Sequence, residues 1–384
     1  MIMKKKVTIL WRNVPEYRRP FYLHLREYLL QRDIELHVIY GQSTDMALNC
    51  ATELPIAWAK CVQHRRVAIG PLEICWQPYA RYIRDADLII VEQANRLLLN
   101  YLLIARRPFS GKKIAFWGHG RDLQNGPYTI RNRWKRMFVK HADWWFAYTA
   151  DVAEEISKYG FPRERITNVQ NTIDTDTLLR AKAEISAQHL ETLKTELQLG
   201  GGPIGIYCGR MYKDKRIGFL LEACRRVREQ ISGFELLAVG SGEEQEKIIS
   251  AARNCHWIHY VGPKYKEERV PYFLFSDLFL MPGLVGLVVV DCFALETPLV
   301  TTRFPFHSPE VAYVKNNVNG LITADNIHDY VAGICGLLSD PGRLATLKSG
   351  CRQSASIYTM QTMVENFSNG ISACLDKERF GFAS

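Results

Sequence analysis

Two basic side chains stand where a predicted strand gives way to a helix in the second half of the chain. The run IYCGRMYKDKRIGF, residues 206–219, places Arg210 directly after a short apolar stretch and Lys215 five residues later, just before a helical pattern. Two cations beside a helix N-terminus, where backbone N–H groups lack partners, suit a phosphate group. The spacing therefore predicts an anion site, with a merely solvated surface loop as the alternative.

A second stretch, MPGLVGLVVVDCFALETP at residues 281–298, combines glycines with a single acid inside an apolar run. Gly286 permits a close approach of backbone to a ligand, and residues 287–295 predict the first turns of a buried helix. Asp291, one turn into that helix, is placed to accept hydrogen bonds from two hydroxyl groups. The uncharged run, residues 278–290, has 13 residues, whereas a membrane-spanning helix needs about 20.

Short apolar runs recur along the whole chain and alternate with helical patterns such as residues 217–231. This alternation predicts parallel sheets covered on both faces, that is, an α/β chain of two doubly wound, Rossmann-like domains facing a central cleft. Ligands bind such sheets at the carboxyl ends of the strands. The predicted strands are residues 7–11, 34–40, 87–91, 113–117, 144–148 and 166–169, then 203–208, 235–239, 257–261, 278–281, 298–302 and 320–323.

The length of 384 residues is large for a single core, so two domains are expected. The boundary is predicted in a polar, helix-prone segment that ends in a glycine cluster. Residues 1–175 form the first predicted domain, 176–202 a linker, 203–355 the second domain, and 356–384 a helix that crosses back to the first.

Composition and charge narrow the possible partners and the compartment. The ten cysteines lie far apart without zinc spacing, as expected of buried thiols in a reducing compartment. Residues 1–180 carry 28 Lys and Arg against 18 Asp and Glu, whereas residues 181–384 carry 21 against 22. The basic half predicts an anionic partner, namely a phosphate-bearing substrate, a membrane surface or nucleic acid. Without a signal-peptide pattern, we expect the cytoplasm, including the inner face of its membrane.

Taken in order, the motifs of the second half resemble the donor domain of GT-B glycosyltransferases. They are most similar to glycosyltransferase family 4, a retaining family that uses nucleotide-sugar donors. The order is strand-Gly-Arg-x4-Lys, then strand-Gly-x-Gly within residues 236–244, then a Pro turn with Gly-Leu-x3-acid-x2-Ala-x3-Pro. With the stretches at 116–122, 141–175 and 301–323, the resemblance covers residues 5–335.

The resemblance implies the GT-B fold and transfer of a hexose, from a UDP- or GDP-linked donor, to a glycan or lipid-linked glycan. Surface polysaccharide, lipopolysaccharide or O-antigen synthesis is the implied setting. Arg210 and Lys215 would hold the donor diphosphate and stabilise the leaving group, so no metal or other cofactor is expected. His119, between Gly118 and Gly120, would contact the donor sugar near the reaction centre.

The chain departs from the family's acidic motif, which has two glutamates eight residues apart. Asp291 takes the place of the second, which meets the ribose, but Gly283 replaces the first, which contacts the transferred sugar. Glu296 lies where the family commonly has glycine and does not substitute for it. Sugar recognition would then rest on His119 and on backbone N–H groups. Those groups belong to Gly286, Leu287 and Val288, and Glu310 is a further candidate for the same site.

The first domain is expected to bind the acceptor. Residues 131–140 carry five Lys and Arg without an acid, and residues 11–22 and 100–113 also mix arginines with aromatic or aliphatic side chains. Such surfaces suit an anionic membrane leaflet and a lipid-linked acceptor, although the apolar face of 131–140 could equally pack on the sheet. Arg18 and Arg19 are candidates to meet an acceptor phosphate.

Three alternatives to an active transferase stay open on the sequence. Gly283 is compatible with a GT-B-shaped protein that binds a nucleotide sugar without turnover. The net charge of +9 is compatible with a nucleic-acid binder, but no nucleic-acid motif is present and no such partner is expected. A GT-B epimerase is the third. The transferase is favoured because Arg210, Lys215, Asp291 and His119 are all present.

Overall fold

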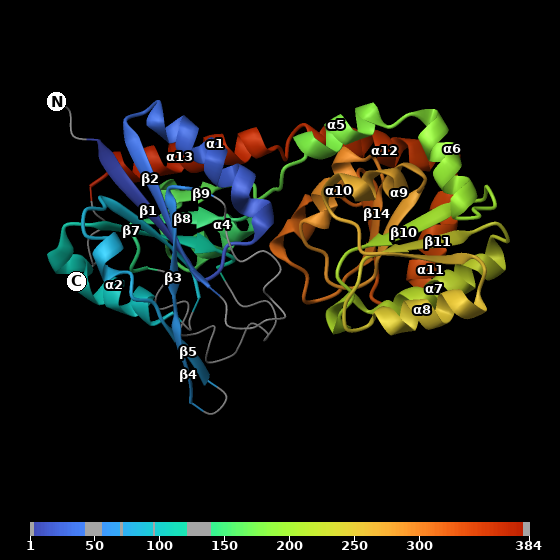
Figure 1. Cartoon of the computed structure of the whole chain (residues 1–384), viewed down its shortest axis with the longest axis horizontal. Coiled ribbons are helices and arrows are strands. Elements are labelled where there is room, and N and C mark those ends of the chain that lie inside the picture. Colours follow the sequence, from blue (N-terminus) through green and yellow to red (C-terminus); the bar gives the residue numbers. More distant parts are fainter. Residues whose placement is uncertain (1–3, 43–55, 70–71, 95–96, 121–139, 379–384) are drawn as a thin grey trace. The chain divides into compact units, whose positions relative to one another are not determined.

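The fold is described from a computed structural model, which places residues 4–42, 56–69, 72–94, 97–120 and 140–378. The chain divides into two compact units (Figure 1). Unit 1 comprises Met1–Ile173 and Met360–Ser384, and unit 2 comprises Asp174–Thr359. The last helix, α13 (Met360–Asp376), therefore belongs to unit 1. The expected linker contains two helices, α5 (Asp176–Glu184) and α6 (Ala187–Glu196), and both belong to unit 2.

Unit 1 contains a parallel sheet of seven strands in the order β3-β2-β1-β6-β7-β8-β9. Most of its central strands are buried along their length, because helices cover both faces and leave no polar side to the sheet. The strands are β1 (Lys5–Trp11), β2 (Ile34–Gln42), β3 (Ala59–Gln63), β6 (Leu88–Glu92), β7 (Lys113–Gly118), β8 (Trp144–Ala147) and β9 (Ile166–Asn168).

Two hydrophobic cores occupy the two faces of this sheet. Strand β6 shows the division, because Leu88 and Ile90 belong to one core while Ile89 and Val91 belong to the other. The first core includes side chains of α1 (Arg19–Leu30) and α13, and the second includes side chains of α2 (Leu98–Ser110) and α4 (Ala150–Lys158). The N-terminal and C-terminal segments of the chain thus share one core.

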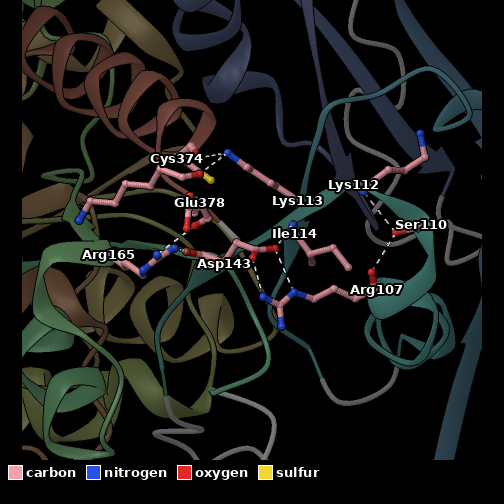
Figure 2. Close-up of polar contacts among 10 residues, drawn as sticks. Arg107, Ser110, Lys112, Lys113, Ile114, Asp143, Arg165, Cys374 and Glu378 are labelled. Carbon is pink, nitrogen blue, oxygen red and sulfur yellow. Dashed lines mark hydrogen bonds and ion pairs between the residues drawn. The ribbon is translucent and has the colours of Figure 1, made fainter. Parts of the chain in front are cut away.

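The C-terminal end of α13 is tied to the sheet of unit 1 by cationic side chains (Figure 2). The ammonium of Lys113 donates to the carbonyl oxygens of Cys374 and Leu375, at 2.8 and 2.6 Å. Arg165 donates to the carbonyl oxygen of Glu378 at 3.0 Å. The last carbonyl groups of a helix have no partner within it, so these cations stabilise that end.

A buried ion pair lies beside this attachment (Figure 2). The carboxylate of Asp143 pairs with the guanidinium of Arg107 at 2.5 Å, and both side chains are buried. Asp143 also accepts the backbone N–H of Ile114 at 2.9 Å. The pair therefore joins the end of α2 to β7 and to the start of β8.

Unit 2 contains a parallel sheet of six strands in the order β12-β11-β10-β13-β14-β15. The chain runs outward from β10 (Ile204–Cys208) to β11 (Glu235–Val239) and β12 (Ile258–Gly262), then returns to β13 (Leu278–Met281) on the other side of β10. The neighbouring strands β10 and β13 thus form the topological switch point, where ligands bind in open α/β sheets. The remaining strands are β14 (Leu299–Thr302) and β15 (Gly320–Thr323), and the helices after α6 are α7 (Ile217–Gln230), α8 (Gln245–Asn254), α9 (Val270–Leu274), α10 (Val288–Ala294), α11 (Ile327–Leu338) and α12 (Pro341–Ala355).

All twelve strands predicted from the apolar runs are present, with bounds that differ by at most two residues. The predicted fold class, two α/β domains with doubly wound parallel sheets, is confirmed. Three further strands were missed, namely β3 and the antiparallel pair β4 (Arg65–Ile69) and β5 (Leu72–Trp76). Across the described ranges, no helix is long and apolar enough to cross a membrane.

Candidate functional site

The loops that follow β10 and β13 lie together at the switch point of unit 2. We call residues 209–216 the β10 loop and residues 282–286 the β13 loop. The backbone N–H of Leu284 donates to the carbonyl oxygen of Asp214 at 2.9 Å. In return, the ammonium of Lys215 donates to the carbonyl oxygen of Leu284 at 2.5 Å. The two loops are therefore joined by both backbone and side chain.

Lys215 is a buried cation at this junction. Its side chain is 8% exposed, and burial lowers the pKa of its ammonium to about 8, against the opposing effect of Asp214. An ammonium has three N–H donors. One donates to Leu284, the ring of Tyr212 lies 5.5 Å away, and no second oxygen acceptor for this ammonium occurs among the described residues. Lys215 thus has donor capacity left for an anion.

Arg210 comes from the same loop but is exposed to solvent. Its guanidinium is 3.9 Å from the carboxylate of Glu243, at the long limit for an ion pair. The hydroxyl of Tyr207, in β10, donates to the carbonyl oxygen of Arg210 at 2.9 Å, which fixes the backbone at this point. The loop therefore offers one exposed and one buried cation at the carboxyl edge of the sheet.

The two glycines of the β13 loop have different surroundings. A Cβ atom on Gly283 would lie 2.1 Å from the carbonyl oxygen of Asp214 and 2.8 Å from the carbonyl carbon of Lys215. No side chain fits there while the two loops are joined, which gives a physical reason for the missing acid. A Cβ atom on Gly286 would have Ser308 Oγ, at 3.7 Å, as its nearest neighbour in the described structure, so packing does not require glycine at 286.

Asp291 lies in α10 and is 1% exposed. Burial raises the pKa of its carboxyl group to about 6, and the nearby charge of Arg269 opposes this rise. The Arg269 guanidinium, from the short helix η6 (Lys266–Arg269), donates to the Asp291 carboxylate at 2.9 Å. Ribose hydroxyls at Asp291 would therefore compete with Arg269. Helix α10 begins at Val288 and Leu287 is its N-cap residue, which agrees with the predicted helix start to within one residue.

His307, which the sequence analysis did not select, holds the β13 loop from another direction. Its Nδ1 accepts the backbone N–H of Val285 at 3.0 Å, and its Nε2 donates to the carbonyl oxygen of Thr302 at 2.8 Å. Glu310, in the short helix η7 (Pro309–Tyr313), is 3% exposed. The HisSerProGlu sequence gave no signal for His307, because a lone histidine is more often structural than functional.

Arg216 was also missed, although it directly follows Lys215. Its φ of 57° lies in the left-handed region, which favours glycine. Its guanidinium donates to the carbonyl oxygen of Pro282 at 3.3 Å and pairs with Asp325. Arg216 therefore adds another link between the β10 and β13 loops.

The remaining predicted site residues belong to unit 1. His119 follows β7 and is exposed, with its ring 4.3 Å from that of Tyr148 in an edge-on arrangement. Arg18, in the short helix η1 (Glu16–Arg18), is 4% exposed. It donates to Asn171 and to the carbonyl oxygen of Thr172, and its guanidinium lies 5.4 Å from the ring of Trp117. Arg18 thus has a structural role within unit 1.

Arg19 is exposed at the start of α1, and its contact with an acceptor phosphate stays a prediction. Of the basic stretch 131–140, residues 131–139 lie outside the described residues. In the part of the chain that is described, no group of three His, Cys, Asp or Glu side chains could hold a metal ion.

Two family models match this chain, one for each half. The model described as Glycosyltransferase Family 4 matches residues 21–177, and the model described as Glycosyl transferases group 1 matches residues 202–340. Among curated proteins, the amylovoran biosynthesis glycosyltransferase AmsK of Erwinia amylovora is 26% identical over 34% of this chain and 34% of its own length. A glycogen synthase of Mycobacterium tuberculosis is 25% identical over 59% of this chain and 53% of its own length. The matches thus span about a third to a half of these relatives.

Solved structures resemble the whole chain. HepE of Anabaena, in complex with UDP, has a TM-score of 0.71 at 14% identity, covering 96% of this chain and 99% of its own. A glycosyltransferase of Rickettsia africae has a TM-score of 0.71 at 14% identity, covering 98% and 100%. The lipopolysaccharide outer core galactosyltransferase WaaB has a TM-score of 0.65 at 14% identity, covering 96% and 99%. The chain therefore has the GT-B fold and belongs to the glycosyltransferases whose first half matches the family 4 model and whose second half matches the group 1 model.

Proposed function

We propose that the chain is a retaining, metal-independent glycosyltransferase that moves a hexose from a nucleotide sugar to a glycan or lipid-linked glycan of the cell surface. The observation that carries this proposal is the buried Lys215 at the switch point, with donor capacity left, in one loop with the exposed Arg210. HepE was solved with UDP and with UDP-glucose, which supports a UDP-sugar donor. AmsK and WaaB, named for amylovoran and lipopolysaccharide, support a surface-glycan acceptor.

Charge development explains why these cations would serve the reaction. The bond between the anomeric carbon and the phosphate oxygen breaks, and its electron pair leaves with the nucleoside diphosphate. The acceptor hydroxyl forms the new bond on the same face of the sugar, and its proton goes to the leaving phosphate oxygen. Arg210 and Lys215 would stabilise the negative charge that builds on the diphosphate. Asp291 would meet the ribose, and His119 together with the N–H groups after Gly286 would meet the sugar.

The direct test is turnover with matched variants. The protein is incubated with a panel of UDP- and GDP-sugars, and release of the nucleoside diphosphate is measured with and without glycan acceptors. Arg210→Ala and Lys215→Met should abolish release, whereas Lys213→Met, which removes an exposed cation two residues away, should leave it close to that of the unmodified protein. NMR of the product anomer tests retention, and an assay in excess chelator tests metal independence. Equal activity of Lys215→Met and Lys213→Met would overturn the proposal.

A GT-B-shaped binding protein without turnover is the second candidate, because Gly283 removes the acid that contacts the sugar in the family. It predicts that a nucleotide sugar binds but that no nucleoside diphosphate is released with any acceptor. Calorimetric binding without release would select this second function.

We also propose that unit 1 meets an anionic membrane through α2. Leu98, Leu102 and Phe109 are exposed along this helix, Phe109 to 91%, and the exposed cation Arg106 lies among them. An exposed apolar stripe that includes a cation suits an anionic bilayer surface. Flotation with vesicles containing phosphatidylglycerol should decrease severalfold in the Leu102→Ser/Phe109→Ser variant. Leu179→Ser, which changes an exposed leucine of unit 2, is the matched control. Failure of the unmodified protein to float with these vesicles would refute this contact.

A further inference from the structure

Two sets of contacts hold the β13 loop, one from the β10 loop and one from β14 and the residues after it, and the proposed chemistry uses only the first set. The first set joins Leu284 to Asp214 and Lys215, and Pro282 to Arg216. The second set includes contacts to residues 307 and 308, which follow β14. His307 accepts the N–H of Val285, and the N–H of Ser308 donates to the carbonyl oxygen of Val285 at 3.0 Å. Each polar backbone group of Val285 is therefore bound by this second segment.

The two hydrogen bonds of His307 define its chemical state. Nδ1 can accept the N–H of Val285 only without a proton, and Nε2 needs a proton to donate to the carbonyl oxygen of Thr302. The ring is therefore the neutral imidazole with its proton on Nε2. The side chain is 9% exposed, so loss of either hydrogen bond would leave a backbone group without a partner away from solvent.

The position of Val285 decides what this contact controls. Its preceding neighbour, Leu284, offers the carbonyl oxygen that receives Lys215, and its following neighbour, Gly286, leads into the first turn of α10. A shift of Val285 would therefore move the anchor of the buried cation and the N–H groups of that turn together. A displacement of about 1 Å at reacting groups can cost 100-fold in rate.

We propose that His307 is a positioning residue for sugar transfer: through Val285 it fixes the carbonyl group that aims Lys215 at the leaving diphosphate. This inference rests on the proposed function, since it assumes that Lys215 stabilises the leaving group. Both ring nitrogens of His307 bind backbone, so in this proposal His307 acts through Val285.

Burial of the ring favours the neutral form of His307 at neutral pH. Burial lowers the pKa of His307; among its neighbours, Lys215 of the β10 loop lowers it further, while the Thr302 carbonyl and Asp325 raise it. Protonation would place an N–H at Nδ1 against the N–H of Val285 and break this link. Burial raises the pKa of Asp291 to about 6, so its ionisation would also contribute to a pH profile, and variants compared at one neutral pH separate the two residues better.

Three substitutions separate the two hydrogen bonds of His307. In His307→Asn, the side-chain oxygen can still accept from Val285. In His307→Gln, the side-chain NH₂ can still donate to Thr302, and His307→Phe keeps the ring without either bond. We expect kcat to fall about 100-fold in the Phe and Gln variants with little change in donor KM, and the Asn variant to stay within about tenfold of the unmodified protein.

The measurements are kcat, donor KM and the melting temperature of each variant. A structural role alone would lower the melting temperature without this order of kcat values. The inference fails if a folded Phe variant keeps normal kcat, or if the Gln variant is as active as the Asn variant. If the unmodified protein transfers sugar and needs Lys215, those results refute only the inference about His307. If it releases no nucleoside diphosphate from any donor, the proposed function fails and the positioning role fails with it.

Discussion

Each unit buries a cation near the carboxyl edge of its sheet, and the two cations differ in how their donors are used. Arg18 of unit 1 bonds Asn171 and Thr172 and lies against aromatic rings, including that of Trp117. Lys215 of unit 2 donates to a single carbonyl oxygen, that of Leu284. A buried cation needs partners to offset the loss of hydration. Arg18 finds them in the protein, whereas Lys215 has room for a partner from outside.

The difference teaches that burial alone does not mark a functional cation. Both residues were candidates on the sequence, and the number of acceptors around each separates them. The lowered pKa of Lys215, at about 8, reports the same incomplete compensation, because a fully paired ammonium would not lose its proton so readily. The comparison can be tested by removing each cation in turn.

The largest expected effect is on turnover. Lys215→Met should lower kcat/KM by about 1,000-fold while leaving the melting temperature unchanged or higher, because the substitution removes a poorly compensated buried charge. Arg18→Met should instead destabilise unit 1 by about 2–3 kcal/mol, because Asn171 and Thr172 lose a charged partner. Steady-state kinetics and calorimetric unfolding of both variants measure this contrast. The comparison breaks if Arg18→Met is fully stable, or if Lys215→Met melts well below the unmodified protein.

The next effect concerns the packing that holds Lys215 in place. Gly283→Ala should destabilise unit 2 by about 1–3 kcal/mol and weaken nucleotide binding, since its Cβ atom would meet the backbone of the β10 loop. Gly286→Ala is the matched control, because its Cβ atom would make only an ordinary van der Waals contact, with Ser308 Oγ at 3.7 Å. Unfolding and nucleotide titrations of both variants are the measurements. Equal behaviour of the two alanines would show that the close approach at Gly283 is unimportant.

A pH dependence follows from the pKa of Lys215, lowered from 10.5 to about 8. A bound diphosphate favours the charged ammonium, so binding takes up a proton above pH 8. The association constant should fall by up to about tenfold per pH unit above that value, and Lys215→Met should remove this slope. Stability of the free protein should rise between about pH 8 and 10.5, because the unfolded lysine holds its proton there. Calorimetric titrations at several pH values test whether the association constant falls as the pH rises above 8. An association constant that increases with pH in this range would contradict the prediction.

The smallest expected effect is a loss of stability in unit 1 that leaves unit 2 unchanged. Lys113→Met removes the cation at the end of α13 and should destabilise unit 1 by about 1 kcal/mol, without changing nucleotide binding in unit 2. Lys112→Met, which changes the neighbouring lysine that bonds the carbonyl groups of Arg84 and Ala86 instead, controls for loss of charge. Amide exchange in α13 distinguishes the variants. A change in nucleotide affinity would mean that the attachment of α13 reaches unit 2.

The sheets could be predicted from the sequence because buried parallel strands read as short, nearly continuous apolar runs. Strand β3 was missed because it is an edge strand, and none of its five residues AKCVQ is fully buried. Strand β4 begins with two arginines, which interrupt such a run. The prediction thus failed at an edge strand and at a strand that begins with charged residues.

The cations of the candidate site were also predictable, since Arg210 and Lys215 follow one strand within one loop. The surroundings of these two cations could not be predicted from the sequence, because they depend on which loops lie next to one another in the folded chain. Gly283 looked like a lost contact in the sequence, whereas the structure shows that Asp214 leaves no room for a side chain there. His307 lies 22 residues from Val285, and no local pattern marks that pairing.

The central claim is that the β10 loop binds the diphosphate of a nucleotide sugar, and thermal unfolding tests it most directly. The unmodified protein, Arg210→Ala and Lys213→Met are heated with UDP, GDP, ADP, TDP and CDP and with their common sugar conjugates. A ligand at 100 times its dissociation constant stabilises the folded protein by about 2.7 kcal/mol. We predict stabilisation by one nucleotide family, kept in Lys213→Met and lost in Arg210→Ala. No stabilisation by any nucleotide, or equal stabilisation of all three proteins, would contradict the account.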